Sequence, residues 1–76
     1  MEKILMPKMG MTMEYGTIAE LFVKVGDAVN EGDPLFEFET NKMSDTVNAP
    51  CGGTIQEICC EVDEDVPVGE VVCVIG

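Results

Sequence analysis

An internal repeat is the feature that most constrains what this chain can fold into. Gly16-Thr17-Ile18-Ala19-Glu20 recurs as Gly53-Thr54-Ile55-Gln56-Glu57, an offset of 37 residues (53 − 16) without a gap. Other positions matched at this offset are Val25 with Val62, Val29 with Val66, and Gly32 with Gly69. A duplicated unit that cannot bury its apolar face alone packs against its copy. We therefore predict two similar halves related by a pseudo-twofold axis.

The segment that joins the two halves is Glu39-Thr40-Asn41-Lys42-Met43-Ser44. If the halves pair about a twofold axis, this segment lies at one end of the molecule and the chain termini lie at the other. Asn41 suits the first central position of a type I′ turn, so residues 40–43 are predicted to form a tight hairpin. Lys42 is then displayed at the tip, at a position where hairpin propensity favours Gly.

Short β-branched runs separated by Gly, Asp, Asn and Pro predict an all-β domain of many short strands. The expected strands are residues 3–6, 17–25, a short one at Val29, 35–40, 44–49, 54–62 and 71–75. Turns are expected at 26–27, 32–34, 50–53, 63–65 and 67–69. Paired halves of this kind form a flattened barrel of two short sheets.

Both long strands contain the same slip in the alternation of apolar residues. In the first half these residues are Ile18, Leu21 and Val23, and in the second they are Ile55, Ile58 and Cys60. A slip shared by both copies predicts a β-bulge or strand corner in each. It also places Cys60 inside and Cys59 outside.

The two halves differ in one connection. If Met6-Pro7 is matched to Ala49-Pro50, Gly16 follows its proline by nine positions and Gly53 follows its proline by three, so the first half has six more residues (9 − 3). These residues form a loop, 8–15, that the fold does not require. The methionines at 6, 9, 11 and 13 allow two interpretations: a soft surface for a partner, or a loop packed back on the body.

Composition excludes several classes of function. The 76 residues allow one small domain, residues 1–76, and the net charge of −11 argues against binding nucleic acid or an anionic membrane surface. The charge indicates either docking on basic patches of larger partners or a surface kept soluble by like charge. With no signal peptide and no apolar run of membrane-spanning length, we expect a cytoplasmic protein.

The cysteines do not predict a site. Cys51, Cys59, Cys60 and Cys73 are expected to be thiols in a reducing compartment rather than a disulfide framework. They lack the paired spacing of a zinc site and the chain has no histidine, so no metal site is predicted.

Lys42 is the candidate functional residue. An exposed lysine is protonated at neutral pH and has no buried site that would activate it as a base or Schiff-base nucleophile. It could instead accept an acyl group that another enzyme has activated. Glu37 and Glu39 are interpreted as a solvated face, because nothing assembles a pocket around them. No catalytic residue is predicted, and the domain is expected not to be an enzyme.

The residues now described closely resemble a known family. The segment Met6 to Ile18 is similar to the opening of lipoyl domains from the acyltransferase component of 2-oxo acid or acetoin dehydrogenase complexes. The similarity continues through Gly26-Asp27, Gly32-Asp33-Pro34-Leu35, Glu39-Thr40, Lys42, Ala49-Pro50, Gly53-Thr54-Ile55 and Val66-Pro67-Val68-Gly69. The resemblance implies a flattened eight-stranded barrel of two antiparallel sheets with internal pseudo-twofold symmetry (a barrel-sandwich hybrid).

The resemblance also implies a site and partners. Lys42 would carry lipoate in amide linkage as a swinging arm, attached by a lipoate ligase or lipoyltransferase that recognises Glu39, Thr40, Asn41 and Met43. A thiamine-diphosphate-dependent dehydrogenase component would load the arm, the acyltransferase core would unload it, and dihydrolipoamide dehydrogenase would reoxidise it. The loop that helps the dehydrogenase component recognise its domain corresponds to Lys8, Met9, Gly10, Met11, Thr12, Met13, Glu14 and Tyr15.

Two alternatives remain open. Lipoyl domains usually have Asp before the lysine and often Ala after it, whereas biotinyl domains have Met on both sides. Here Asn41 and Met43 flank Lys42, so the turn is a hybrid, and the 8–15 loop favours lipoate. The first alternative is a biotinyl carrier domain of a biotin-dependent carboxylase or decarboxylase. The second is an unmodified β-domain that only binds other proteins.

Overall fold

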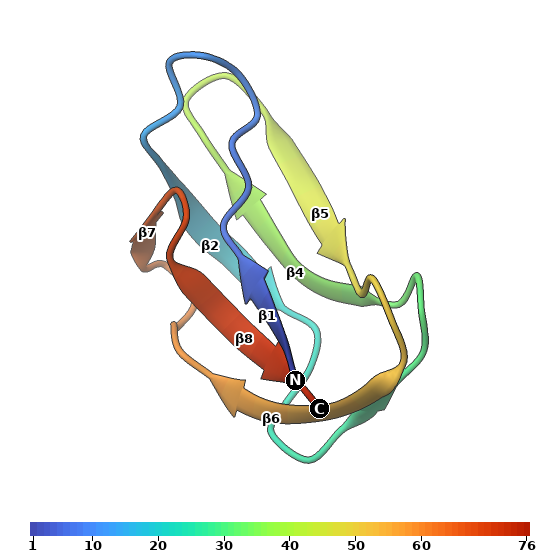
Figure 1. Cartoon of the computed structure of the whole chain (residues 1–76). Helices are drawn as coiled ribbons and strands as arrows, with labels where there is room; N and C mark the ends of the chain where they lie inside the picture. The colour runs from blue at the N-terminus through green and yellow to red at the C-terminus, as the bar shows by residue number, and fades with distance from the viewer.

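The computed structural model describes all of residues 1–76 and contains eight β-strands (Figure 1). They are β1 (Glu2–Leu5), β2 (Tyr15–Leu21), β3 (Ala28–Val29), β4 (Pro34–Glu39), β5 (Ser44–Asn48), β6 (Gly53–Ile58), β7 (Asp65–Pro67) and β8 (Val71–Ile75). The structure has no helix with the length and apolar character of a membrane span.

The strands form two four-stranded antiparallel sheets of matching construction. One sheet has the order β1-β8-β6-β3 and the other the order β5-β4-β2-β7. The repeat relates β2 to β6, β3 to β7 and β4 to β8, and the matched prolines relate β1 to β5. Exchanging each strand for its copy converts one order into the other. The predicted all-β fold of two short sheets is confirmed.

The backbone hydrogen bonds between the halves are reciprocal. The Gly26 amide donates to the Ile55 carbonyl at 2.8 Å, and the matching Asp63 amide donates to the Ile18 carbonyl at 2.7 Å. Each half therefore closes the turn of the other, as expected for a duplicated unit that folds against its copy.

A second reciprocal pair joins each Gly turn to the end of the matching outer strand. The Gly32 amide donates to the Ala49 carbonyl at 2.8 Å, and the Gly69 amide donates to the Met6 carbonyl at 3.0 Å. Both glycines have a φ of 91°, a left-handed conformation that glycine adopts without steric cost. The turn residues of the repeat thus add hydrogen bonds between the halves to those of the paired strands.

The shared bulges are present, but the long strands are shorter than predicted. The register of β2 on β4 shifts between Ile18 and Glu20, and that of β6 on β8 shifts between Ile55 and Glu57. The predictions 17–25 and 54–62 were wrong at their ends, since β2 covers Tyr15–Leu21 and β6 covers Gly53–Ile58. Asp65 and Pro67, predicted as turn residues, belong to β7.

One cluster of buried apolar residues forms the core. Its largest fully buried members are Phe36, Phe38, Met6, Ile18, Leu35, Ile55 and Ile75. Leu35 and Phe36 are both buried although they are neighbours, because the register of β4 on β5 shifts between Pro34 and Phe36. Phe36 and Phe38 pack with ring centroids 6.4 Å apart.

The thiols follow the predicted arrangement. All four cysteines are free, with Cys60 and Cys73 buried and Cys59 exposed. Burial raises the pKa of Cys60 to about 11, with smaller contributions from Glu64 and Cys59. Burial likewise raises the pKa of Cys73 to about 11, with smaller contributions from Cys60 and Cys59. Both buried thiols therefore stay protonated at neutral pH and pack as small apolar groups.

Candidate functional site

Lys42 lies at the tip of the hairpin between β4 and β5. Glu39 and Ser44 are the last paired residues of the two strands, and the Thr40 amide donates to the Met43 carbonyl at 2.7 Å. Asn41 and Lys42 are thus the two central residues of the connection, and both are exposed. Figure 1 shows this hairpin at the opposite end of the molecule from the chain termini.

Thr40 holds the hairpin turn with its side chain. Its Oγ1 atom accepts hydrogen bonds from the backbone amides of Lys42 and Met43, each at 3.2 Å. A Thr hydroxyl that accepts from amides two and three residues further on replaces the backbone bond of an ordinary turn. Thr40, expected as a residue read by a ligase, therefore has a direct role in positioning Lys42.

The predicted type I′ turn was wrong. Such a turn requires positive φ at both central residues, whereas Asp63 is the only non-glycine residue of the chain with positive φ. Asn41 and Lys42 therefore have ordinary backbone conformations. The physical reason is the Thr40 hydroxyl, which closes the turn without left-handed residues.

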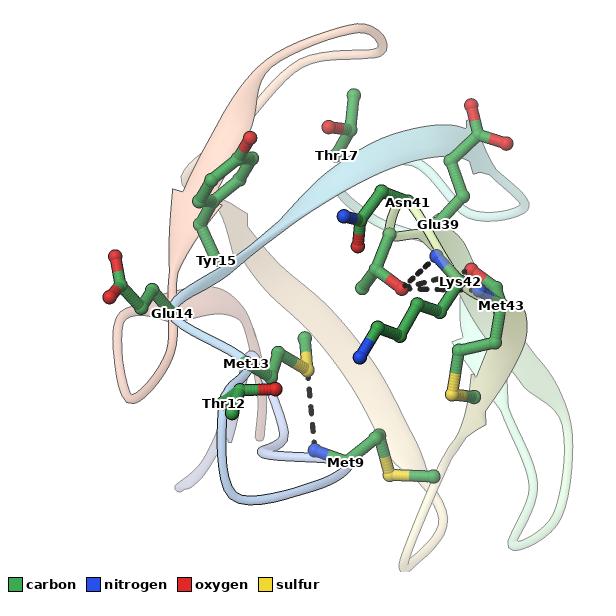
Figure 2. Close-up of a pocket in the computed structure, with 11 residues that line it drawn as sticks. Met9, Thr12, Met13, Glu14, Tyr15, Thr17, Glu39, Asn41, Lys42 and Met43 are labelled. Atoms are coloured by element: carbon green, nitrogen blue, oxygen red, sulfur yellow. Dashed lines mark hydrogen bonds between the residues drawn. The ribbon is translucent and has the colours of Figure 1, made fainter.

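A groove of about 680 Å³ separates the hairpin from the loop that follows β1. Residues 9 and 12–15 form one wall, residues 39–43 form the other, and Thr17 of β2 contributes between them. Figure 2 shows the Lys42 side chain extending from the hairpin toward the loop. The sequence interpretation that nothing assembles a pocket around Glu39 was wrong, because Glu39 lines this groove.

The loop after β1, residues 6–14, is anchored at both ends. Met6 is only 1% exposed and belongs to the core, and Met13 is half-buried and packs against it. The Met9 amide donates to Met13 Sδ at 3.2 Å, and the Glu14 carbonyl accepts from the Val68 amide at 3.0 Å. The loop is thus held over one wall of the groove.

The methionines divide between the two interpretations that the sequence left open. Met6 and Met13 pack on the body, whereas Met11 is 94% exposed and Met9 is 43% exposed. Tyr15, predicted as part of the loop, is a residue of β2 paired with Pro67, and its side chain is exposed. The predicted loop therefore contributes to the core, the groove and the surface.

The charged residues of the groove are one lysine and two glutamates. Lys42 is the only basic residue in the lining, which also contains the carboxylates of Glu14 and Glu39. Lys8, Gly10 and Met11 belong to the predicted loop but do not line the groove. The site thus combines one exposed amine with a wall that carries apolar and acidic side chains.

The fold and the site define a small β-domain that displays one amine on a hairpin closed by hydrogen bonds, far from its chain ends. The chain belongs to the biotin/lipoyl family, since the family model described as "Biotin-requiring enzyme" matches residues 2–75.

Curated relatives point to the lipoyl branch of this family. The chain is 44% identical over 68 residues to the dihydrolipoyllysine-residue succinyltransferase component of the 2-oxoglutarate dehydrogenase complex of Rickettsia typhi, covering 90% of this chain and 17% of the relative. It is 36% identical over 74 residues to the dihydrolipoyllysine-residue acetyltransferase component of the acetoin cleaving system of Bacillus subtilis, covering 97% and 19%. The chain thus spans about a fifth of the length of these relatives.

A solved structure supports the same assignment. The lipoyl domain of the 2-oxoglutarate dehydrogenase complex from Azotobacter vinelandii superimposes with a TM-score of 0.82 and 28% identity, covering 97% of this chain and 94% of that one. The resemblance to lipoyl domains seen in the sequence is confirmed, and the biotinyl alternative has less support.

Proposed function

We propose that residues 1–76 form one lipoyl carrier domain in which Lys42 carries lipoate in amide linkage on Nζ. The observation that carries this proposal is the exposed position of Lys42 at the hairpin tip, opposite the termini. At this position a second enzyme can reach the amine. The lipoyl relatives support lipoate as the group attached there.

The residues around Lys42 suit such a group. The Lys42 side chain is free to extend, and the groove beside it presents the apolar side chains of Met9, Met13, Tyr15 and Met43. The Thr40 hydroxyl accepts hydrogen bonds from the Lys42 and Met43 amides and so helps to hold the turn that presents the amine. Glu39, Asn41 and Met43 lie with Lys42 on the hairpin and are the side chains that a lipoate ligase or lipoyltransferase would contact.

A bound lipoyl group supplies a cyclic disulfide that can accept an acyl group together with two electrons. The domain contributes presentation and no catalytic step of its own. Its partners would be the thiamine-diphosphate-dependent dehydrogenase component, an acyltransferase core and dihydrolipoamide dehydrogenase. A tether makes these encounters local, at effective concentrations of about millimolar. We place the domain in the cytoplasm, where its four free thiols stay reduced.

Loading tests the proposal directly. The domain is co-expressed with a lipoate ligase and, separately, with a biotin ligase, and its intact mass is measured. We expect one lipoyl-sized addition, which Lys42→Ala abolishes. Lys24→Ala is the matched control, because Lys24 is also exposed but lies outside the groove lining. It should be loaded like the unmodified sequence.

The other outcomes identify the alternatives. A biotin-sized addition on Lys42 would make the chain a biotinyl carrier domain of a biotin-dependent enzyme. No addition with either ligase would leave an unmodified interaction domain. A lipoyl addition that persists in Lys42→Ala would show that the modified lysine is a different one.

A further inference from the structure

The groove between the loop and the hairpin has an unusual lining for a surface that only presents a lysine. Its four apolar members are Met9, Met13, Tyr15 and Met43, three thioethers and one aromatic ring. They come from both walls, and Lys42 is itself part of the lining (Figure 2). No aliphatic β-branched or leucine side chain contributes. The apolar part of the lining is thus polarisable, and the remaining lining residues are polar or charged.

Its size and position suit a small group attached to Lys42. Protein sites for small molecules have volumes of about 300–1,000 Å³, and this groove measures about 680 Å³. Since the amine lies in the lining, a group on Nζ starts inside the groove and needs no domain movement to enter it. The occupant is then present at high effective concentration.

The charge of the lysine decides when the groove can be filled. Before modification, the Lys42 ammonium is strongly hydrated and favours water over the thioether and aromatic side chains, although the carboxylates of Glu14 and Glu39 in the same lining attract it. Amide formation removes this charge and adds an aliphatic chain that ends in a cyclic disulfide. Aromatic rings make favourable contacts with sulfur, and flexible methionine side chains pack against apolar groups of varied shape. The modified arm therefore suits the apolar part of the groove better than the bare lysine does.

We propose that the groove lined by Met9, Met13, Tyr15 and Met43 is a resting subsite for the lipoyl group carried by Lys42. The inference rests on the proposed function. The arm exchanges between a docked position in the groove and an extended position in solvent. In the docked position it covers the groove wall formed by residues 9 and 12–15, so a partner that binds this wall displaces the arm.

Nuclear magnetic resonance of the loaded domain tests the subsite. Intact mass first establishes that Lys42 carries the lipoyl group. With labelled methionine methyls, we expect nuclear Overhauser contacts between the dithiolane protons and the methyls of Met9, Met13 and Met43. The Nζ amide of the arm should also be less mobile than that of lipoyl-lysine in a short peptide. Absence of both signals in a fully loaded domain overturns the subsite and leaves the proposed function intact.

A matched pair of variants in the same loop sharpens the test. Met9→Gln removes a thioether from the groove and shifts the equilibrium toward the extended arm. The nuclear Overhauser signal between the dithiolane protons and the Met13 methyl should therefore fall about twofold. Met11→Gln makes the same change at a residue that is 94% exposed and outside the lining, and should change nothing. Equal effects of the two variants overturn the proposal. A domain that no lipoate ligase loads overturns the subsite and the proposed function together.

Discussion

The two halves of the domain share their backbone plan but fill their common core unequally. The first half contributes Leu35, Phe36 and Phe38, and the matching positions of the second half hold Val72, Cys73 and Ile75. The strand orders and the reciprocal turn bonds are nevertheless the same. The symmetry therefore resides in backbone hydrogen bonds and turns, while the side chains only need to fill one shared volume.

The halves also differ at their ends. The first half ends in the Lys42 hairpin, whereas the matching positions of the second half are the chain termini: Gly76 corresponds to Glu39 and Met1 to Ser44. Only one end of the duplicated structure therefore has a continuous tip, and that tip carries the amine. Substitutions at paired positions can show which differences between the halves are needed for stability.

Substitutions in the unequal core are expected to change the free energy of unfolding the most. Phe36→Ala removes a ring with no exposed surface, and such changes cost about 3–5 kcal/mol of the free energy of unfolding. A domain of this size has only a few kcal/mol available, so the variant should be largely unfolded at 25 °C. Cys73→Ala, at the matching position, removes one sulfur and should cost about 1 kcal/mol. Urea unfolding followed by circular dichroism measures both, and similar losses would contradict an unequal core.

High pH should destabilise the domain through the thiols of the second half. Because burial raises the pKa of Cys60 and Cys73 from 9.0 to about 11, the folded state favours their protonated form. This stability is fully present below pH 9 and is lost as the pH rises from 9 to 11. Each thiol should account for about 2 kcal/mol at pH 11.

Urea unfolding at pH 8 and pH 10.5 measures this loss. Cys73→Ala is the control, since it removes one of the two buried thiols and leaves every other ionisable side chain in place. The decrease should be smaller in the variant. If the free energy of unfolding decreased equally in the original sequence and in Cys73→Ala, the loss would come from groups other than Cys73.

Matching turns provide the third comparison. Gly26 and Asp63 occupy the same turn position, with φ values of 96° and 72°. An aspartate at positive φ carries backbone strain that glycine avoids. Asp63→Gly should raise the free energy of unfolding by about 0.5 kcal/mol, and Gly26→Asp should lower it by about 1 kcal/mol. Asp63→Asn is the control, because it removes the charge but keeps a side chain at the same φ. If it raised the free energy of unfolding as much as Asp63→Gly does, the effect would come from the charge and not from backbone strain.

Shortening the loop should have the smallest effect on stability. Deleting residues 8–13 gives Pro7-Glu14-Tyr15-Gly16, the length of the matching Pro50-Cys51-Gly52-Gly53. A connection shortened from nine positions to three gains about 1 kcal/mol of chain entropy, offset by the lost packing of the half-buried Met13. The melting temperature should therefore change by only a few degrees. An unfolded variant would show that the loop is needed for folding.

Much of the fold could be predicted because the same bulge and turn residues occur once in each half of the sequence. Ile18 and Ile55 mark the same bulge twice, and Gly32 and Gly69 mark the same turn twice. The strand ends were less predictable. Val23 continues the apolar pattern of β2 and is buried, but the strand itself ends at Leu21.

The site was only partly predictable. The exposed tip at Lys42 follows from the symmetry alone, but the turn type does not, because it depends on the Thr40 hydroxyl rather than on its central residues. The burial of Met6 depends on its contact with Gly16, where an added Cβ would lie 2.9 Å from Met6 Sδ. No local sequence pattern predicts the groove, because its two walls are far apart in the sequence and lie opposite each other only in the folded domain.

The neighbouring chain termini make a circular form of this domain feasible. Glu2 pairs with Ile75, and a Cβ added to Gly76 would lie 3.1 Å from Met1 Cγ. A four-residue bridge of the sequence Thr-Asn-Lys-Met between Gly76 and Met1 would restore at that end the segment that the second half lacks. Such a ring would present two amines that face in opposite directions. After treatment with a lipoate ligase, mass spectrometry would then detect two lipoyl groups on one backbone.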